Sequence, residues 1–423
     1  MLIVVEETKV LTGEIQAPPS KSYTHRAIIA SALSKGSSKI SFPLHSSDIT
    51  ATINACKALG ASIIKNTKTL KIIGFPELNV YPSYIDCRDS ASTLRFLTPL
   101  VALTKGKTVL DGSVGLRRRP VDPLIKALTN LGVHCSSNQG FPPVSVFGSG
   151  LKGGTTSLVG NVSSQFVTGL LFACPFAKEE TKITLTTPLE SKPYVNLTLD
   201  VLRYHDIAVE VSDNFRSFKI PANQSYSPRD HVVPGDFSSA AFLLAAAALT
   251  NSVVTVKNLF QNQPDSEIVK LLSKMGVKLR VSNNAVSLLG GKLKAIDIDA
   301  RDIPDLVPVC VVLACASEGT TNIWGAKRLQ IKESDRLGAL TSELHKMGAD
   351  VTKTVDGMVI HGPSELTGGV IDPHNDHRIA MACTLAGLIA KGKTEILEAQ
   401  CVNKSYPNFF EDLRILGAKI NVK

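Results

Sequence analysis

The chain of 423 residues is poor in aromatic side chains, and its cysteines form no recognisable metal-binding pattern. Only 5% of the residues are aromatic, so a surface on which nucleic acid bases stack has little support. No CxxC pair and no Cys/His cluster at zinc-ligand spacing is present, which argues against a structural zinc site. We expect free thiols in a reducing cytoplasm at all eight cysteines: Cys56, Cys87, Cys135, Cys174, Cys310, Cys315, Cys383 and Cys401.

Long hydrophobic runs are also missing. The longest two, Ala240–Leu249 and Val307–Ala316, are too short to span a bilayer and are typical of buried helices. The start, MLIVVEETKV, is strand-like and carries acidic residues early, unlike a signal peptide. We therefore expect a cytoplasmic globular protein without a membrane partner. Its length exceeds one ordinary hydrophobic core and predicts two domains.

The net charge of +9 indicates a partner of opposite charge, either nucleic acid or an acidic small molecule. The longest basic cluster is only Arg117-Arg118-Arg119, and few aromatic residues accompany it. Acidic small molecules are therefore favoured over nucleic acid.

A short sequence pattern recurs six times. In each copy a predicted helix ends, a turn residue follows, and a strand rich in β-branched residues begins. Glycine at the turn position permits the left-handed backbone that ends a helix, and aspartate tolerates it better than most residues. Six units that each mix helix and strand predict an α/β protein with two pseudo-symmetric domains of three units. The turn positions lie 69 to 74 residues apart: Gly60, Gly132, Asp206, Gly276, Gly348 and Gly417.

Polar and basic side chains gather where helices are predicted to begin. Ser20 is expected to cap a helix whose first turns carry Lys21, Ser22 and Arg26. Cations oppose the positive end of a helix dipole, so this placement favours anion binding over helix stability. Each segment alone is also compatible with an ordinary capped helix. The pattern recurs in Arg117–Arg119 before Pro120, which is expected as the first residue of a helix, in Ser163-Ser164-Gln165, in Ser191-Lys192 with Tyr194, in Lys332-Glu333 with Asp335-Arg336, in Asp376-His377-Arg378, and in Lys404.

If the helices of both domains direct these ends at one cleft, the cleft attracts anions. Asp305, Glu333 and His377 are the titratable groups among the cations, which predicts acid–base chemistry. The residues alone therefore predict an enzyme that binds two anionic small molecules and transfers a group between them.

Several segments occur in the order found in the 5-enolpyruvylshikimate-3-phosphate synthase family, and KESDR followed by NDHR is the most specific pair. The chain resembles that family from Pro19 to Pro407. The resemblance implies six βαβαββ repeats, three in each of two inside-out α/β barrel domains. It places residues 1–19 and 235–423 in a phosphoenolpyruvate-side domain, and residues 20–234 in a shikimate 3-phosphate-side domain. The segments are PSKSYTHRA, DSASTLR, LRRRP, SSQF, SKPY, IPDL, KESDR, NDHR and NKSYP.

The resemblance implies transfer of the enolpyruvyl group of phosphoenolpyruvate to the 5-hydroxyl of shikimate 3-phosphate. The implied reaction passes through a tetrahedral intermediate, releases phosphate, and needs neither metal nor cofactor. We expect the protein to be a monomer. The implied base is Asp305 and the implied acid is Glu333, shared with Lys21, while His377 supports Glu333 or a phosphate oxygen.

Two sets of binding residues follow from the same resemblance. Residues implied to bind shikimate 3-phosphate are Lys21, Ser22, Arg26, Ser163, Ser164, Gln165, Ser191, Tyr194, Asp305 and Lys332. Residues implied to bind phosphoenolpyruvate are Lys21, Asp89, Ala91, Arg119, Gln165, Arg336, Arg378 and Lys404.

Two alternatives stay open at this point. A sister enzyme transfers enolpyruvate to UDP-N-acetylglucosamine, but it usually has a reactive cysteine in the loop that corresponds to Asp111–Pro120, where this chain has none. A non-catalytic anion-binding or RNA-binding protein built on the same repeat is the other. It would have no need for Asp305 and Glu333 among the cations.

The chain departs from the family pattern where Asn-Ala-Gly or Asn-Ser-Gly reads Asp89-Ser90-Ala91. Asp89 replaces an amide next to an anionic substrate, so its contact with phosphoenolpyruvate is in question. Arg328 stands where many relatives carry asparagine, and it is left out of the predicted site.

The methyl group of Ala91 is expected to narrow the space beside phosphoenolpyruvate and to lower sensitivity to glyphosate. Inhibition curves of the wild type and Ala91→Gly test this. We expect the glycine variant to be inhibited at lower glyphosate concentration, and equal inhibition would refute the steric explanation.

Overall fold

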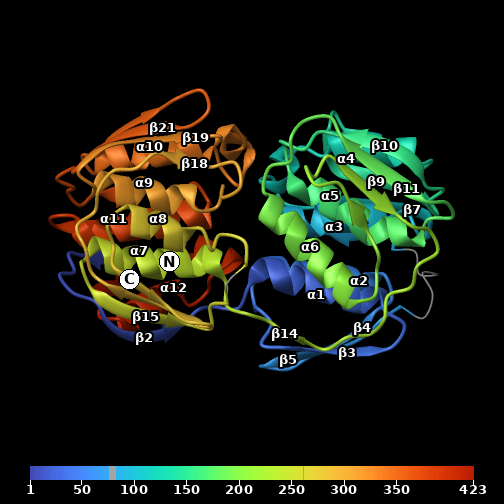
Figure 1. The fold of residues 1–423 in the computed structure, drawn as a ribbon, viewed down its shortest axis with the longest axis horizontal. Helices are drawn as coiled ribbons and strands as arrows, with labels where there is room; N and C mark the ends of the chain where they lie inside the picture. Colours follow the sequence, from blue (N-terminus) through green and yellow to red (C-terminus); the bar gives the residue numbers. More distant parts are fainter. Residues whose placement is uncertain (76–81, 261) are drawn as a thin grey trace. The chain divides into compact units, whose positions relative to one another are not determined.

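The computed structural model describes residues 1–75, 82–260 and 262–423. The chain divides into two compact units (Figure 1): unit 1 is Met1–Pro19 with Pro234–Lys423, and unit 2 is Ser20–Val233. Each unit holds three four-stranded sheets. All six sheets have the same order, in which a parallel pair at one edge is followed by two antiparallel neighbours.

Unit 1 contains three strand–helix–strand–helix–strand–strand repeats. The first is β2 (Thr12–Gln16), α7 (Phe237–Leu249), β15 (Val253–Lys257), α8 (Ile268–Lys274), β16 (Leu279–Val281) and β17 (Ala285–Leu289). The second is β18 (Ile298–Asp299), α9 (Val307–Cys315), β19 (Gly319–Trp324), the 3₁₀ helix η3 (Lys327–Ile331), α10 (Arg336–Lys346), β20 (Asp350–Lys353) and β21 (Met358–Gly362). The third is β22 (Val370–Ile371), α11 (His377–Ile389), β23 (Lys393–Ile396), the 3₁₀ helix η4 (Ala399–Lys404), α12 (Phe409–Ile415), β24 (Ile420–Val422) and β1 (Ile3–Glu6).

Unit 2 repeats the same plan. The first repeat is β14 (His231–Val232), α1 (Lys21–Leu33), β3 (Ser37–Ser41), α2 (Ser47–Ala58), β4 (Ser62–Lys65) and β5 (Thr69–Ile73). The second is β6 (Tyr84–Asp86), α3 (Ala91–Val101), β7 (Lys105–Asp111), the 3₁₀ helix η1 (Leu116–Arg118), α4 (Asp122–Asn130), β8 (His134–Asn138) and β9 (Phe141–Ser149). The third is β10 (Gly154–Leu158), α5 (Ser164–Ala173), the 3₁₀ helix η2 (Cys174–Phe176), β11 (Thr181–Leu185), α6 (Lys192–Tyr204), β12 (Glu210–Val211) and β13 (Ser217–Ile220). The predicted α/β fold with six βαβαββ repeats is confirmed.

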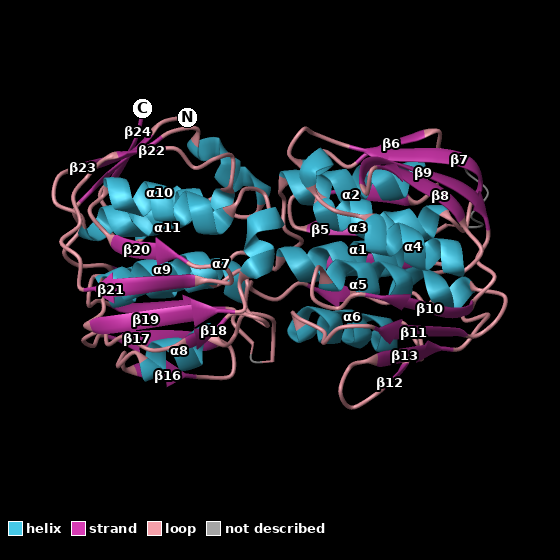
Figure 2. Cartoon of the chain, turned by 90° about the horizontal axis from the view of Figure 1, so that it is seen from above, coloured by secondary structure: helices cyan, strands magenta, loops and turns pink. Residues whose placement is uncertain are grey.

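The first helix of each repeat in unit 1, namely α7, α9 or α11, lies inside that unit, with strands at its outer side (Figure 2). In unit 1, the helices α7, α9 and α11 pack on one another, and nearly all of their residues are buried. A helix enclosed on every side has no solvent face, which is why these segments are apolar throughout rather than amphipathic. The apolar runs Ala240–Leu249 and Val307–Ala316 are explained by this enclosed position.

The six predicted turn residues all have the left-handed backbone. Glycine reaches this region without strain because it lacks a Cβ atom, and aspartate is among the residues that tolerate it. Each turn follows the second helix of its repeat and leads into the third strand. The φ angles are 106° at Gly60, 83° at Gly132, 64° at Asp206, 94° at Gly276, 87° at Gly348 and 103° at Gly417.

Three strands join repeats that lie far away in the sequence. β2 pairs in parallel with β15, where Thr12 faces Val253. β14 pairs in parallel with β3, and β1 pairs antiparallel with β23. Within unit 1, the backbone N–H of Asp236 donates to the carbonyl oxygen of Pro18 at 2.8 Å. In each unit, at least one sheet is therefore completed by a strand that lies far from its partner strand in the sequence.

All eight cysteines lie in the described part of the chain, where they are free and form no disulfide. Among the described residues, none of the helices combines the length and the apolar character needed to cross a membrane.

Replacing Gly132 with alanine tests the backbone requirement at the turns. An added Cβ atom would meet the nearest atom, in Lys152, only at 3.5 Å, so the cost comes from the φ of 83° rather than from a clash. We expect Gly132→Ala to lower the free energy of unfolding by about 1–2 kcal/mol, measured by urea denaturation. Gly132→Asn is the control and should cost less, because asparagine tolerates this region. Equal losses in both variants would contradict the explanation.

Candidate functional site

A buried arginine forms the centre of a charged cluster in unit 1. The Arg336 side chain, at the start of α10, is 2% exposed. Its Nη1 atom donates to Asp305 Oδ1 at 3.0 Å, and its Nη2 atom donates to Glu333 Oε2 at 2.7 Å. Its Nε atom donates to Asp376 Oδ2 at 2.8 Å. One planar guanidinium thus holds three carboxylates, because its five N–H groups point in fixed and different directions.

A second arginine fixes Asp305 from the other side. Arg378, in the first turn of α11, donates through Nη2 to Asp305 Oδ2 at 3.1 Å and through Nη1 to the Asp305 carbonyl oxygen at 3.0 Å. Asp305 stands just before α9, as the sequence predicts. Its two carboxylate oxygens therefore bind two different arginines, which fixes the plane of the carboxylate.

These cations determine the protonation state of Asp305. Burial raises the pKa of its carboxyl group, but Arg378, Lys332 and Arg336 lower it by more, and the pKa lies well below its usual range. For Arg336, burial lowers the pKa, whereas Asp376, Glu333 and Asp305 raise it, and the net result is a raised pKa. At neutral pH, Asp305 is therefore an ionised carboxylate.

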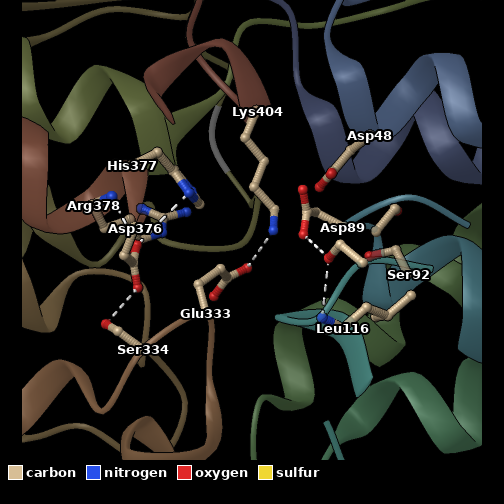
Figure 3. A network of polar contacts seen from close by, with 12 residues as sticks. Asp48, Asp89, Ser92, Leu116, Glu333, Ser334, Asp376, His377, Arg378 and Lys404 are labelled. Carbon is tan, nitrogen blue, oxygen red and sulfur yellow. Dashed lines mark hydrogen bonds and ion pairs between the residues drawn. The ribbon is translucent and has the colours of Figure 1, made fainter. Parts of the chain in front are cut away.

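The remaining members of the cluster surround the same centre (Figure 3). Lys404, at the end of η4, lies 3.5 Å from Glu333 Oε1. Asp376 is the N-cap of α11 and accepts from the backbone N–H of Arg378 at 2.9 Å and from Ser334 Oγ at 3.1 Å. His377 is almost fully buried, and its Nδ1 atom lies 3.7 Å from Asp376 Oδ1. The structure thus brings together the predicted residues Asp305, Lys332, Glu333, Arg336, His377, Arg378 and Lys404.

In unit 2, the start of α1 carries cationic side chains as predicted. Ser20 caps the helix by accepting from the backbone N–H of Tyr23 at 3.3 Å. Lys21 Nζ lies 3.1 Å from Asp48 Oδ2, a buried carboxylate in the first turn of α2. Arg26 is buried, and burial lowers the pKa of its guanidinium to about 9, so that it stays a cation at neutral pH. This helix end thus holds two cations, of which one has a carboxylate partner from α2.

Polar contacts fix the Arg26 side chain. Its Nε atom donates to Thr198 Oγ1 at 2.9 Å, and its Nη1 atom donates to the Ser22 carbonyl oxygen at 2.8 Å. Its Nη2 atom donates to the Tyr194 carbonyl oxygen at 2.9 Å. Arg26 therefore ties the start of α1 to the first turns of α6.

The start of α5 is organised by an arginine that the sequence analysis did not assign to the site. Arg95, from α3, donates through Nη1 to Ser163 Oγ at 3.2 Å and to Gln165 Oε1 at 2.9 Å. Gln165 Nε2 in turn donates to Ser92 Oγ at 2.9 Å. Ser163 caps α5, and Ser164 is buried in its first turn. Arg95 is visible in the segment DSASTLR, but nothing in the sequence shows that it reaches a helix about 70 residues away.

The start of α6 has an unusual backbone. Ser191 is buried and has a φ of 58°, which places it in the left-handed region at a non-glycine residue. Such a conformation costs on the order of 1–3 kcal/mol and concentrates at functional sites. Tyr194 follows in the first turn and is partly buried. Ser191 and Tyr194 are thus held at the N-terminal end of α6, as the sequence predicts.

The prediction of a helix that starts at Pro120 is wrong. α4 begins at Asp122, and Pro123 rather than Pro120 occupies its first turn. Arg117 and Arg118 lie in η1, and the N–H of Arg119 closes this turn on the Leu116 carbonyl oxygen at 2.9 Å. The Pro120 carbonyl oxygen accepts from Arg95 Nη2 at 2.8 Å, a tertiary contact that holds the chain away from a helix. Arg119 is nevertheless buried, which sets it apart from the exposed Arg117 and Arg118.

Asp89, the departure from the family pattern, accepts a hydrogen bond from Ser113 Oγ (Figure 3). The same Ser113 oxygen accepts from the backbone N–H of Leu116 at 3.3 Å. Asp89 thereby contacts the loop that carries η1. Ala91 is the first residue of α3 and is buried, so a change at this position alters the packing around the helix start.

Among the described residues, no group of three or more histidine, cysteine, aspartate or glutamate side chains is placed to hold a metal ion. The charged residues of the two units are organised instead as arginine–carboxylate contacts and as polar helix starts.

Replacing Asp376 with asparagine tests how much the buried ion pair with Arg336 stabilises unit 1. Asparagine also caps helices well, so the change chiefly removes the charge. We expect a loss of about 1.5–3 kcal/mol in the free energy of unfolding, because charge-assisted hydrogen bonds to Arg336 are lost while Asp305 and Glu333 still balance its charge. Urea denaturation measures this. Ser334→Ala, which removes one hydrogen bond to the same carboxylate, should cost only about 1 kcal/mol, and equal losses would show that the charge is unimportant.

The chain is similar to known proteins over nearly its whole length. A sequence model described as EPSP synthase (3-phosphoshikimate 1-carboxyvinyltransferase) matches residues 5–413. The chain is 42% identical over 429 aligned residues to a 3-phosphoshikimate 1-carboxyvinyltransferase from Methanocaldococcus jannaschii, with 100% of both chains covered. It is 46% identical to the protein of that name from Methanocella arvoryzae, with 97% of both covered.

A solved structure of an EPSP synthase from Acinetobacter baumannii is similar at a TM-score of 0.84 and 28% identity. The similarity covers 100% of this chain and 99% of that one. A match of the family model over most of the chain, relatives above 40% identity over the full length, and the shared fold all agree. The chain therefore belongs to the EPSP synthase (3-phosphoshikimate 1-carboxyvinyltransferase) family.

Proposed function

We propose that the chain transfers the enolpyruvyl group of phosphoenolpyruvate to the 5-hydroxyl of shikimate 3-phosphate and releases phosphate. The observation that carries this proposal is the full-length match to relatives that bear the name of this activity. The chemistry of the charged cluster in unit 1 supports it, because that cluster combines anion-binding arginines with carboxylates that can transfer protons.

Unit 2 is proposed as the shikimate 3-phosphate side. Hydroxyl groups and backbone N–H groups at the starts of α5 and α6 are suited to a phosphate, because helix N-termini attract anions. Ser22 and Arg26 would bind the substrate carboxylate, and Gln165, Tyr194 and Lys332 its ring hydroxyls. The groups proposed for the phosphate are Lys21, Ser163, Ser164 and Ser191.

Unit 1 is proposed as the phosphoenolpyruvate side. Arginine pairs bidentately with carboxylate and phosphate, which suits a substrate that carries both groups. Four of the five N–H groups of Arg336 already donate to protein carboxylates. Bidentate binding of a substrate anion by Arg336 would therefore displace Glu333 or Asp305, and would release that carboxylate for proton transfer. The side chains proposed to bind phosphoenolpyruvate are Lys21, Asp89, Ala91, Arg119, Gln165, Arg336, Arg378 and Lys404.

The proposed reaction is an addition followed by an elimination. In the addition, the 5-hydroxyl loses its proton to Asp305 as its oxygen bonds to C2 of phosphoenolpyruvate, while the methylene carbon takes a proton from Glu333, shared with Lys21. In the elimination, the methyl carbon returns a proton to Glu333, the double bond re-forms, and the bond from C2 to the phosphate oxygen breaks. His377 would support Glu333 or a phosphate oxygen. Neither step needs a redox cofactor, and no metal is invoked.

We also propose that the protein works as a monomer in the cytoplasm. The eight free cysteines support a reducing compartment, because disulfides are rare there.

Variants of the two carboxylates test the chemistry. The assay mixes the protein with both substrates, without added metal, and measures phosphate release. We expect Asp305→Asn and Glu333→Gln each to lower kcat by about 10²–10⁴-fold. Each variant replaces a carboxylate with an amide of nearly the same shape, which cannot transfer the proton. Glu318→Gln, at an exposed carboxylate outside the cluster, is the matched control and should keep wild-type kcat. No phosphate release by the wild type would overturn the proposed activity, and full activity of Asp305→Asn would overturn the assigned base.

A further inference from the structure

The loop of residues 372–376 has a costly backbone conformation. It links β22 to α11 and presents Asp376, His377 and Arg378 at its end. His374 and Asn375 are consecutive non-glycine residues with φ angles of 53° and 54°. Backbone of this kind persists only when the surrounding structure holds it in place. The contacts that hold this loop are therefore part of the machinery that places Arg378.

Helix α10 holds the loop at its beginning through a buried carboxylate. Glu343 is only 1% exposed. Its Oε2 atom accepts from the backbone N–H of Asp372 at 3.0 Å, and its Oε1 atom lies 3.0 Å from His374 Nε2. The two oxygens of one carboxylate thus fix one backbone atom and one side chain of the loop.

The same helix holds the loop at its end. Arg336 donates through Nε to Asp376 Oδ2 at 2.8 Å. Arg336 and Glu343 are seven residues apart, which is two helical turns, so both side chains leave the same face of α10. A rigid helix therefore fixes the two ends of the strained loop at a set spacing.

A buried carboxylate is a costly way to hold a loop unless its geometry matters. Removing an ionised group from water carries a penalty that hydrogen bonds must offset. Lys346 Nζ, 2.7 Å from Glu343 Oε2, supplies charge compensation, but its side chain is 46% exposed and it follows Glu343 on the same helix. Lys346 balances the charge of Glu343, whereas Asp372 and His374 are the groups that Glu343 places.

We propose that Glu343 and His374 are positioning residues for phosphoenolpyruvate binding, which act by clamping the 372–376 loop so that Arg378 and Asp376 meet Asp305 and Arg336. This inference rests on the proposed function and deepens it. Neither residue is proposed to touch a substrate. Their effect is carried by the backbone of the loop to the first turn of α11.

Steady-state kinetics of His374 variants test the clamp. His374 is partly exposed, so its removal leaves little void and the fold should persist. We expect His374→Ala to lower kcat/KM for phosphoenolpyruvate by roughly 10–100-fold, since small misplacements of binding groups have effects of this order. KM for shikimate 3-phosphate should change less, by about twofold, because only Asp305 and Lys332 among the side chains proposed to bind it lie in unit 1. His374→Gln, whose amide N–H can replace Nε2–H, should recover most of the loss, and Glu343→Gln should resemble His374→Ala.

His361→Ala is the matched control, since His361 is an exposed histidine of unit 1 whose side-chain hydrogen bond goes to Thr320. It should leave both substrate parameters at wild-type values. Equal effects of His374→Ala on both substrates, or thermal destabilisation with an unchanged kcat/KM for phosphoenolpyruvate, would reduce Glu343 and His374 to ordinary structural residues and overturn the proposal.

Hydrogen exchange provides a second readout that needs no turnover. We expect the backbone amides of Asp372 and of residues 374–378 to exchange faster in His374→Ala than in the wild type, while those of α9 stay unchanged. Unchanged exchange in the loop would overturn the clamp even in an active enzyme. A wild type that releases no phosphate would overturn the proposed function instead, and the exchange data would still decide whether the clamp exists.

Discussion

The buried guanidinium of Arg336 is the contact on which the charged centre of unit 1 depends. It joins Asp305 before α9, Glu333 before α10 and Asp376 at the start of α11. Three carboxylates in one place would repel one another and lose hydration, and only a planar cation with several fixed donors can hold them together. A lysine carries its three donors on one rotatable nitrogen, whereas Arg336 uses three nitrogens held in one plane. The raised pKa of Arg336 and the lowered pKa of Asp305 are two expressions of this arrangement.

The repeated topology makes such a centre possible. Each repeat places its first helix inside the unit and begins that helix after a short strand, so equivalent helix ends recur within a unit. The helices α9 and α11 pack together, and α10 packs on α11, so residues that precede or open them come within reach of one another. Helix α10 also contacts the 372–376 loop twice, through Arg336 and Glu343. The fold thus supplies both the cluster and its support.

The sequence predicted those features that depend on local backbone chemistry. The six turns were found because glycine or aspartate is favoured at a positive φ, and the cap Ser20 was found because a side-chain oxygen must accept from a helix N–H. Pro120 was misplaced because a tertiary bond from Arg95 decides the path of that segment. Arg95, Asp48 and Glu343 gave no local signal, since their partners lie far away in the sequence or in a loop of irregular backbone. The roles assigned to individual site residues stay predictions.

The ionisation of Asp305 is the most direct test of the central claim that arginines hold this carboxylate as an anion. A ¹³C NMR titration of aspartate-labelled protein, with the Asp305→Asn variant to assign the signal, would follow this one carboxyl group. We expect it to stay ionised through the range around pH 3.9 in which ordinary aspartates take up their proton, because Arg378, Lys332 and Arg336 surround it. Titration of Asp305 at or above that ordinary value would contradict the electrostatic role given to Arg336 and its neighbours.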